Sequence, residues 1–549
     1  MIPNVLNDYI DSVYKQITTK IKHHKPSKRN LNHRLGSHKA LQELLENQKI
    51  RVVQTDKNLG PALVDEDWYQ TEALRHLNPA AGVYAILSDE DAFNKQESFY
   101  YALEKLADEF KIHDLQGFKF IFQEDSGPAR ARGKDEVKLT TFYHMPKIHK
   151  DDPIIRGRPI VPSTTSATRR LSIWLDQVLK PLVSSFENIL PDSLSLIRSL
   201  QTLKVHQNAV LLTFDVASLY PSINTQRGVN HVCGLLREWD EMNEEMVTLV
   251  ERAMHLVLRN NVFTFEGKIY IQLQGTAMGT SFAPPYANLF LYSLEKKLWK
   301  NHSPLFFRRL IDDGLAIFNN RSEAEAFIKD YNEIDEDINI TSEISTSSIN
   351  FLDITIKKAQ PSTEDPLQLQ HEIYQKPRNA YLYVPFQSMH PEATKKGMIK
   401  GELIRLMRNC STLPAYLNAR DLLFDRLHAR GYPRSLLCKM FTEVSYKERE
   451  QRISEPGNRT KLQPFVLPML YGHDSKAMKI IKILRSNWTI ITQSADIKED
   501  EAATAIFNDE NLPMVSYTMP PNVQSIVNRH YKRNRKYQEQ KAERGREAS

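Results

Sequence analysis

A strand-length apolar run that ends in an aspartate is the feature that most constrains the fold of this chain. Residues 209–217 read AVLLTFDVA, and only Thr213 and Asp215 interrupt the apolar side chains. A run without polar alternation is typical of a strand buried on both faces. We therefore expect a central strand in a sheet that other layers cover. With 549 residues, 41% of them hydrophobic, the chain can build such layers in roughly two to four domains.

A second carboxylate motif lies further along the chain. Residues 306–318, FFRRLIDDGLAIF, are two strand-like halves around Asp312, Asp313 and Gly314, and Asp-Gly between apolar runs is a strong hairpin signal. Nucleotidyl transfer needs carboxylates from different strands at one point, where two divalent ions roughly 4 Å apart neutralise the developing charge. Asp215 at a strand end and the two aspartates at a hairpin tip meet this requirement. Alone, each motif is more often an ordinary strand end or turn.

The segment between the two carboxylate motifs, residues 272–298, is rich in small residues and then turns helical. Gln274 and Gly275 open a loop whose glycines permit close approach of the backbone to another group, here to a base pair. Helical spacing of apolar residues then continues to Leu298. A glycine-rich loop before a core helix would give the same pattern without any substrate. Its position between the carboxylates favours a substrate role.

Three segments carry a resemblance to a known family. In this order, FDVASLYPSI, QGTAMGTSFAPPYANLF and RRLIDDGLAIF resemble motifs A, B and C of reverse transcriptases. The resemblance is closest to Penelope-like retroelements, in which SLYPSI, GTAMGTxFAPPYANLF and an IDD core are distinctive. TDKNLGPALVDEDWY, RGRPIV, INFLDITI and RGYP resemble the motifs on either side. The resemblance implies an RNA-directed DNA polymerase with an α+β right-hand fold, made of fingers, a palm with an antiparallel sheet and helices, and a helical thumb.

The resemblance divides the chain into five segments, with helical extensions at both ends. They are a basic N-terminal helical extension (1–50), the fingers region (51–204), the palm with the catalytic carboxylates (205–365), the thumb (366–470), and a C-terminal helical segment with a basic tail (471–549). The residue pattern predicts strands at RVVQ and PALV, a single strand at SSINFLDITI, and helices over residues 168–188, 241–258 and 391–430.

The resemblance implies that Asp215, Asp312 and Asp313 are catalytic metal ligands, with the backbone carbonyl of Val216 also touching a metal. It implies two Mg²⁺ ions, for which Mn²⁺ could substitute, because such ions take carboxylate and phosphate oxygens. Tyr220 falls where reverse transcriptases place an aromatic ring under the incoming sugar. That ring would clash with a 2′ hydroxyl and so select deoxynucleotides. The alternative role of Tyr220 is that of a packing tyrosine.

Four further residues are implied in nucleotide binding. Gln274 and Gly275 would border the incoming base pair, and Arg158 and Lys57 would hold the triphosphate through charge-assisted hydrogen bonds. Lys57 could equally be an ordinary turn lysine. Three other cations of the fingers region either contact the template or are simply solvated: Lys147, Lys150 and Arg156.

Three positions depart from the reverse-transcriptase pattern. Leu310 stands where many of these enzymes have Tyr or Phe before the aspartate pair, which would weaken contacts to the primer end. Gly314 stands where a larger apolar residue is common, and we expect it to ease the hairpin turn. Asn339 aligns roughly with a lysine that can protonate pyrophosphate in related polymerases. We expect another group or water to serve there.

The expected partners are an RNA template, a DNA primer 3′ end and deoxynucleoside triphosphates. No GIY-YIG endonuclease pattern follows the polymerase motifs, so the chain resembles the endonuclease-lacking members of the family, which are associated with priming at chromosome ends. A truncated copy or a separate endonuclease is equally compatible. Three scattered cysteines form neither a zinc nor a disulfide pattern. The chain shows no signal-peptide layout and no long apolar stretch, so we expect no membrane association. A nuclear location is inferred from the function and the basic tail, and a cytoplasmic one otherwise.

Two alternatives stay open at this point. A B-family DNA polymerase shares SLYPSI after its first aspartate, but its second motif, Gly-Asp-Thr-Asp, is absent here. A non-catalytic or co-opted nucleic-acid-binding protein derived from such an element would keep the same motifs without activity. The formal charge of +6 permits nucleic-acid binding under either reading.

Overall fold

The computed structural model describes most of the chain, and the structural statements below concern these residues. They are 2–23, 40, 43, 49–110, 139–148, 153–359, 366–376, 379–388, 390–454, 466–471, 480–509, 511–518, 526 and 529. Lys150 and most of the two basic clusters near the termini lie outside them. Within this part of the chain, helices and strands are mixed, which confirms the predicted α+β class. None of its helices is long and apolar enough to cross a membrane.

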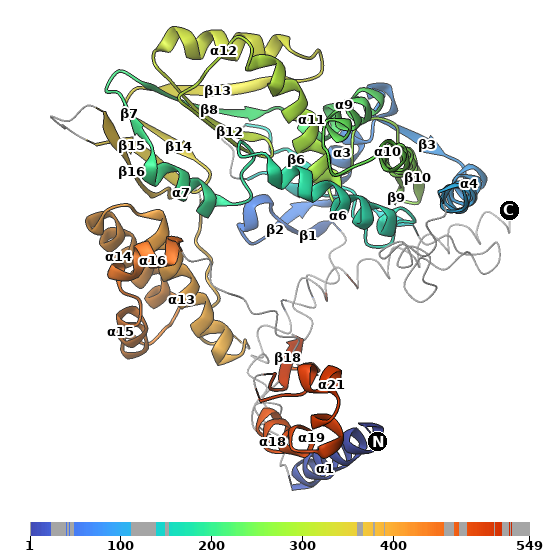
Figure 1. The fold of residues 1–549 in the computed structure, drawn as a ribbon, viewed down its shortest axis with the longest axis vertical. Coiled ribbons are helices and arrows are strands. Elements are labelled where there is room, and N and C mark those ends of the chain that lie inside the picture. The colour runs from blue at the N-terminus through green and yellow to red at the C-terminus, as the bar shows by residue number, and fades with distance from the viewer. Residues whose placement is uncertain are drawn as a thin grey trace.

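A four-stranded antiparallel sheet lies at the centre of the largest body, in the order β11-β12-β8-β13 (Figure 1). The strands are β8 (Val210–Val216), β11 (Phe306–Leu310), β12 (Asp313–Phe318) and β13 (Ile340–Ser345). In β8, Leu211 and Leu212 are both fully buried and belong to two different hydrophobic clusters. Because neighbouring strand residues point to opposite faces, β8 is buried on both sides. The predicted central strand is therefore confirmed.

Five long helices between residues 169 and 333 share the hydrophobic cluster that contains Leu212 and Phe214, to which a helix over Asp89–Glu109 also contributes. They are α6 (Arg169–Ser185), α9 (Thr225–Arg237), α10 (Glu244–Leu258), α11 (Ala283–Leu298) and α12 (Arg321–Glu333). Asparagine side chains accept hydrogen bonds from first-turn amides of α9, α10 and α12, at Asn224, Asn243 and Asn320, and so define where these helices begin. The helices predicted over 168–188 and 241–258 are confirmed.

A second antiparallel sheet, β14-β15-β16-β7, packs against the opposite side of the central sheet around Leu211, Leu315 and Ile317. Its strands are β7 (Lys204–Val205), β14 (Ser348–Phe351), β15 (Ile354–Lys358) and β16 (Leu367–Ile373). The prediction of one strand at SSINFLDITI is wrong. The segment is a hairpin, because Leu352 adopts a φ of 55° and reverses the chain between β14 and β15.

The predicted fingers segment contributes two hairpins and two strands of a small sheet, whose other two strands come from the predicted palm segment. The hairpins join β1 (Ile50–Gln54) to β2 (Pro61–Asp65), with a short 3-10 helix η1 (Asp56–Asn58) between them, and β5 (Tyr143–Pro146) to β6 (Gly157–Ile160). The sheet has the order β3-β10-β9-β4, from Tyr84–Leu87, Lys268–Gln272, Val262–Phe265 and Thr140–Thr141. Helices α3 (Glu66–His76) and α4 (Asp89–Glu109) accompany them. The strands predicted at RVVQ and PALV are confirmed.

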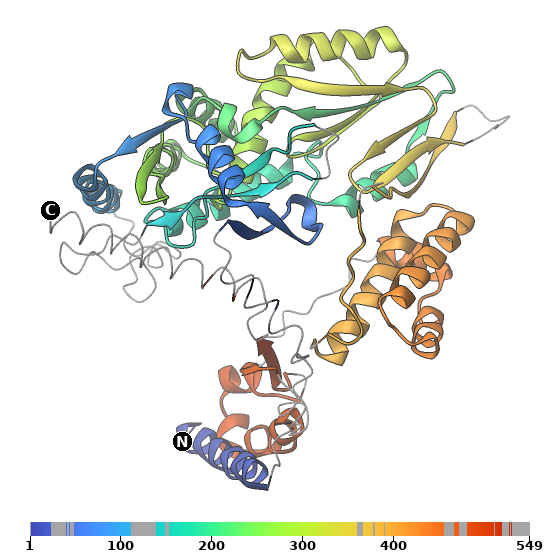
Figure 2. The ribbon, with the colours of Figure 1, turned by 180° about the vertical axis from the view of Figure 1, so that it is seen from behind.

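Two helical bodies complete the described fold (Figures 1 and 2). One contains α13 (Glu392–Asn409), α14 (Leu413–Ala429), α15 (Arg434–Thr442) and α16 (Arg449–Ser454), so the helices predicted over 391–430 are confirmed. α7 (Ser193–Thr202) packs beside α13 and α16.

The other body joins the helix near the N-terminus to elements within residues 466–518. There α1 (Ile2–His23) packs on α18 (Ile480–Ser486) and α19 (Thr489–Thr492), with the rings of Tyr9 and Trp488 centred 5.6 Å apart. Two further helices, α20 (Ala495–Lys498) and α21 (Glu501–Ile506), and a parallel pair of strands, β17 (Val466–Leu470) with β18 (Met514–Thr518), complete this body. The division into five segments stays a prediction.

Candidate functional site

Strand pairing brings the three predicted catalytic aspartates to one end of the central sheet. β12 pairs antiparallel with β8 in a register that sets Asp313 opposite Asp215. Beside this pair, the amide of Val216 donates a 3.0 Å hydrogen bond to the carbonyl oxygen of Asp312. The fold therefore places three carboxylates from distant parts of the sequence side by side.

The turn that presents Asp312 is not the predicted Asp-Gly turn. Leu310 pairs with Asp313 across the hairpin, so Ile311 and Asp312 form the turn, and Ile311 adopts a φ of 57°. Gly314 lies within β12, where a β-carbon would overlap the ring of Phe214. The expectation that Gly314 eases the turn is therefore wrong. The glycine makes room for a buried phenylalanine of β8.

A buried arginine that sequence reasoning missed holds this turn. Arg309 is fully buried, and its guanidinium donates to the carbonyl oxygen of Ile311 at 2.6 Å, to Glu295 at 2.6 Å and to the side chain of Asn288 at 2.9 Å. Glu295 and Asn288 lie on α11, the helix that follows the glycine-rich loop. The guanidinium thus links that helix to the turn carrying Asp312. The available signal was a charged residue in the middle of an apolar strand run.

The three aspartates crowd negative charge at a partly buried place. Burial, together with the charges of Asp312 and Asp215, raises the pKa of Asp313 to about 6. Lys57 and Lys376 act in the opposite direction, but they do not cancel the rise. Such a cluster favours a bound cation, because a cation would remove the repulsion between the carboxylates.

The donor set fits a hard divalent ion only with help from a substrate. Among the described residues, no group of three or more His, Cys, Asp or Glu side chains is arranged to hold a metal ion by itself. Mg²⁺ is commonly held by one or two carboxylates together with substrate phosphates. The aspartates at 215, 312 and 313 have the oxygen chemistry for that arrangement, so the residues present fit the expected ion.

Tyr220 lies beside this cluster. It belongs to the short helix α8 (Leu219–Ser222), which starts after Ser218 with a φ of 51°. Burial and the charge of Asp312 raise the pKa of Tyr220 to about 12, while Arg158 lowers it. The ring is half-buried, and its hydroxyl is within electrostatic reach of a carboxylate and a guanidinium. The structure therefore brings together Tyr220, the aspartates and Arg158.

The predicted substrate loop packs directly on α8. The amide of Thr276 donates a 2.9 Å hydrogen bond to the carbonyl oxygen of Tyr220. Gly275 has a φ of 74°, and a β-carbon there would press on the backbone of Tyr220 and Pro221. The close approach that glycine permits here is thus to the chain itself. Gln274 is half-buried next to this contact, and its carbonyl oxygen accepts a 2.9 Å bond from Gln272.

Two predicted phosphate-binding cations come from different hairpins. Arg158 in β6 donates to Asp56 Oδ1 at 3.0 Å, while Asp56 Oδ2 is buried and has no hydrogen-bond partner among the described residues. Lys57 follows Asp56 directly and adopts a φ of 63°. Asp56 therefore holds Arg158 near the tip of the β1–β2 hairpin. Of the other predicted template cations, Arg156 lies 3.6 Å from Glu72 in an ion pair.

The two remaining departures from the reverse-transcriptase pattern also have places in the fold. Leu310 packs against the cluster between the two sheets, next to the turn that carries Asp312. Asn339 is exposed, and its carbonyl oxygen accepts a 2.8 Å bond from the amide of Ala217. The backbone at Asn339 therefore braces the end of β8 directly after Asp215 and Val216.

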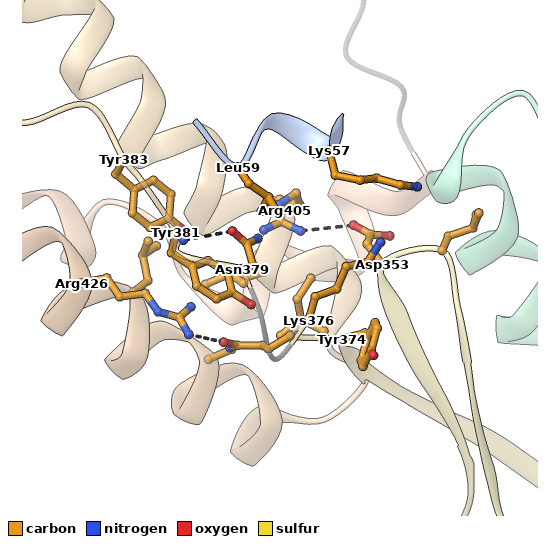
Figure 3. Close-up of a pocket in the computed structure, with 16 residues that line it drawn as sticks. Lys57, Leu59, Asp353, Tyr374, Lys376, Asn379, Tyr381, Tyr383, Arg405 and Arg426 are labelled. Carbon is orange, nitrogen blue, oxygen red and sulfur yellow. Dashed lines mark hydrogen bonds and ion pairs between the residues drawn. The ribbon is translucent and has the colours of Figure 1, made fainter. Parts of the chain in front are cut away.

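A cavity of about 500 Å³ next to Lys57 was also missed (Figure 3). It collects side chains from the β1–β2 loop, from the ends of the second sheet and from α13 and α14. Burial and the neighbouring Lys57 lower the pKa of Lys376, so two ammonium groups share this region. No local pattern could reveal it, because its walls come from segments that are distant in the sequence.

Comparison with known proteins gives one family match and several structural similarities. A family model described as an animal helix-turn-helix domain matches residues 382–440, which contain α13, α14 and most of α15. Among curated proteins, no relative matches this chain.

Three solved structures illustrate the structural similarities. Telomerase from Candida albicans in complex with a fragment of telomeric RNA is 11% identical, with 84% of this chain and 72% of that chain covered and a TM-score of 0.49. The RNA-dependent RNA polymerase of a human picorbirnavirus is 10% identical, covers 82% and 88%, and has a TM-score of 0.44. Apo telomerase from Candida tropicalis is 11% identical, covers 82% and 76%, and has a TM-score of 0.41. At TM-scores below 0.5, these similarities carry no functional assignment.

Proposed function

We propose that this chain is an RNA-directed DNA polymerase of the Penelope-like kind, which extends a DNA 3′ end on an RNA template. The observation that carries the proposal is the register of β8 and β12, which sets Asp215 opposite Asp313 with Asp312 on the adjoining turn. The segments 51–204, 205–365 and 366–470 would act as fingers, palm and thumb. The primer would be a chromosome end or a nick made by a separate endonuclease, which agrees with a nuclear location.

Each site residue has a separate part in this proposal. Asp215, Asp312 and Asp313 would hold two Mg²⁺ or Mn²⁺ ions, together with the carbonyl of Val216. When bound, the ions would supply positive charge at the reacting phosphate and make the primer hydroxyl more acidic. Tyr220 would exclude a 2′ hydroxyl from the incoming sugar by its bulk.

The remaining residues would position the substrate. Arg158 would donate hydrogen bonds to the triphosphate, and its bond to Asp56 restricts the orientations that it can take. Lys57 would add a second cation from the neighbouring hairpin. Gln274 and Gly275 would border the new base pair, because their loop is fastened to the backbone of Tyr220. Tyr220, which would contact the sugar, and the loop that would border the base pair therefore pack against each other.

Primer extension on a defined RNA template tests the proposal. The protein should incorporate deoxynucleotides with Mg²⁺, and Asp312→Asn or Asp313→Asn should reduce the rate by about two orders of magnitude or more, because each removes a metal ligand. Asp421→Asn, an exposed aspartate of α14, is the matched control and should leave the rate unchanged. Tyr220→Ala should admit ribonucleotides. Incorporation that survives both substitutions in the aspartate pair would contradict the metal assignment.

A non-catalytic nucleic-acid-binding protein is the second candidate. The observation in its favour is the helix-turn-helix match over residues 382–440, because such modules bind nucleic acid through one of their helices. This candidate predicts salt-dependent binding of RNA or DNA without any incorporation. The extension assay therefore separates the two candidates.

A further inference from the structure

The cavity beside Lys57 has walls from three separate parts of the chain (Figure 3). Lys57 comes from the β1–β2 loop, and Asp353 and Lys376 come from the ends of strands in the second sheet. Arg405 on α13 and Arg426 on α14 form the helical wall. A volume of about 500 Å³ lies within the range of sites that take one small ligand.

Backbone strain concentrates in these walls. Lys57, Leu352 and Tyr381 line the cavity with φ values of 63°, 55° and 45°. Six non-glycine residues of the described chain have a positive φ, and three of them are here. Strained backbone persists only where the surrounding structure enforces it, and such residues gather at ligand-binding sites. The concentration indicates a formed site.

The lining of the cavity is cationic. One carboxylate, Asp353, faces Lys57, Lys376, Arg405 and Arg426. Asp353 Oδ2 already accepts a 3.2 Å bond from Arg405 and is further occupied by an amide of α13. Arg405 also pairs with Glu402 at 3.0 Å, so Lys57, Lys376 and Arg426 supply the positive charge offered to a ligand. Positive charge in a cavity of this size suits the phosphates of a single nucleotide.

Arg426 carries charge that its own partners do not neutralise. Its guanidinium bonds the neutral side chain of Gln375 and lies 3.4 Å from the centre of the Tyr381 ring. Figure 3 shows it on the side of the cavity away from Lys57. Tyr374 and Tyr383 add further aromatic faces to the lining. Aromatic rings next to cations provide stacking for a base together with contacts for phosphate.

The cavity lies against the β1–β2 loop and adjoins the carboxylates. A β-carbon on Gly60 would lie 2.7 Å from Leu382, so the β1–β2 loop touches the segment that leads into α13. Lys57 and Lys376, which line the cavity, both interact electrostatically with Asp313. The space therefore suits one nucleotide next to the carboxylate site and is too small for a base-paired duplex.

We propose that this cavity holds one free nucleoside triphosphate as the acceptor of the first phosphodiester bond, so that the protein also starts synthesis without a primer. The proposal rests on the polymerase function proposed above. The 3′ oxygen of the held nucleotide would form a bond to the α-phosphorus of the incoming nucleotide. The bond from that phosphorus to the pyrophosphate oxygen would break, pyrophosphate would leave, and the hydroxyl proton would pass to water.

Synthesis on an unprimed template tests the proposal. The full-length protein is given Mg²⁺, a single-stranded RNA with a blocked 3′ end, and nucleoside triphosphates labelled on the γ-phosphate. Only a nucleotide that begins a chain keeps this label. We expect labelled product, and we expect Arg426→Gln to reduce it about tenfold, because one charge-assisted bond to phosphate is lost. Extension of an annealed primer should change less than about twofold.

Arg420→Gln is the matched control, since Arg420 lies on the same helix, pairs with Asp421 and does not line the cavity. It should change neither reaction. Primed extension without any γ-labelled product would overturn this inference and leave the polymerase function standing, and so would labelled product that Arg426→Gln does not reduce.

If no extension occurs at all, the polymerase proposal fails, and equilibrium dialysis with labelled ATP decides about the cavity. Weaker ATP binding by the Arg426→Gln protein than by the Arg420→Gln protein would support a nucleotide site. Equal binding by the two proteins would overturn it.

Discussion

The backbone amide of Gly157 donates a 2.8 Å hydrogen bond to the buried carboxylate of Glu72, and this bond fastens the strand that carries Arg158. The carbonyl oxygen of Gly157 accepts a 3.1 Å hydrogen bond from His76 Nε2, and a β-carbon at position 157 would overlap the ring of His144. Both polar backbone groups of Gly157 are thus held, and no side chain fits. Because neighbouring strand residues point to opposite faces, this arrangement directs Arg158 toward the site.

Replacing Glu72 should therefore affect substrate binding from a distance. Glu72→Ala leaves the buried amide of Gly157 without an acceptor, which should cost about 1–3 kcal/mol of stability in urea unfolding. It should also raise the KM for the nucleotide more than it lowers kcat, because Arg158 loses its fixed position. Glu97→Ala, an exposed residue of α4, is the control. Equal effects on KM and kcat would argue against a positioning role.

Glu72 should remain ionised at mildly acidic pH. Although burial opposes ionisation, hydrogen bonds from Arg75 and Gly157 lower the pKa of Glu72 to about 2. A carboxyl whose pKa is depressed on folding stabilises the fold above its unfolded pKa, and this contribution is lost as the pH falls through about 2. Between pH 7 and pH 5 the destabilisation caused by Glu72→Ala should thus stay constant. A penalty that shrinks over this range would contradict the ionised state.

Asp313 should show the opposite dependence, because its pKa is raised by burial and by its two neighbouring aspartates. Such a group destabilises the fold once it is ionised, so the stability present at low pH is lost as the pH rises through about 6. Asp313→Asn should accordingly raise the melting temperature at pH 8 while reducing the rate by about two orders of magnitude or more. With the wild-type protein, kcat/KM should fall about tenfold per pH unit below pH ~6, as a metal ligand becomes protonated. A pH-independent rate between pH 5 and pH 7 would exclude Asp313 as a metal ligand that titrates in this range.

Gly314→Ala should destabilise the protein because its β-carbon would overlap the ring of Phe214. Overpacking of this kind costs about 1–3 kcal/mol. Phe214→Leu on the same background should restore part of the loss, since the smaller side chain vacates that space. Chemical denaturation of the two single variants and the double variant measures the coupling. Additive effects in the double variant would disprove direct contact between the two side chains.

Arg309→Met should destabilise the protein more than Gly314→Ala does. It leaves Glu295 buried without its ion-pair partner and frees the carbonyl oxygen of Ile311, and breaking a buried pair in this way costs about 3–5 kcal/mol. The double replacement with Glu295→Met should recover stability but not activity, because the turn at Asp312 still lacks its support. Recovery of both would show that Arg309 serves stability alone.

Local sequence patterns were sufficient for the elements around the site. The apolar run ending in Asp215 is a buried strand, and the segment around Asp312 and Asp313 is a hairpin. Two errors arose where a distant contact or one backbone angle overrides local preference. Gly314 accommodates Phe214 from another strand, and Leu352 reverses a chain that reads as continuous strand. The roles of Asp215, Tyr220 and Arg158 stay predictions until activity is measured.

The sequence by itself determined which segments are apolar strands, which are helices, and which carry carboxylates between them, because these depend on periodicity and on neighbouring residues. Only the tertiary structure decided that Asp215 lies opposite Asp313, that Arg309 supports the turn from within, and that Lys57 and Arg426 share one cavity. Strand register, buried ion pairs and cavity walls depend on contacts between segments that are far apart in the chain. No local pattern encodes such contacts.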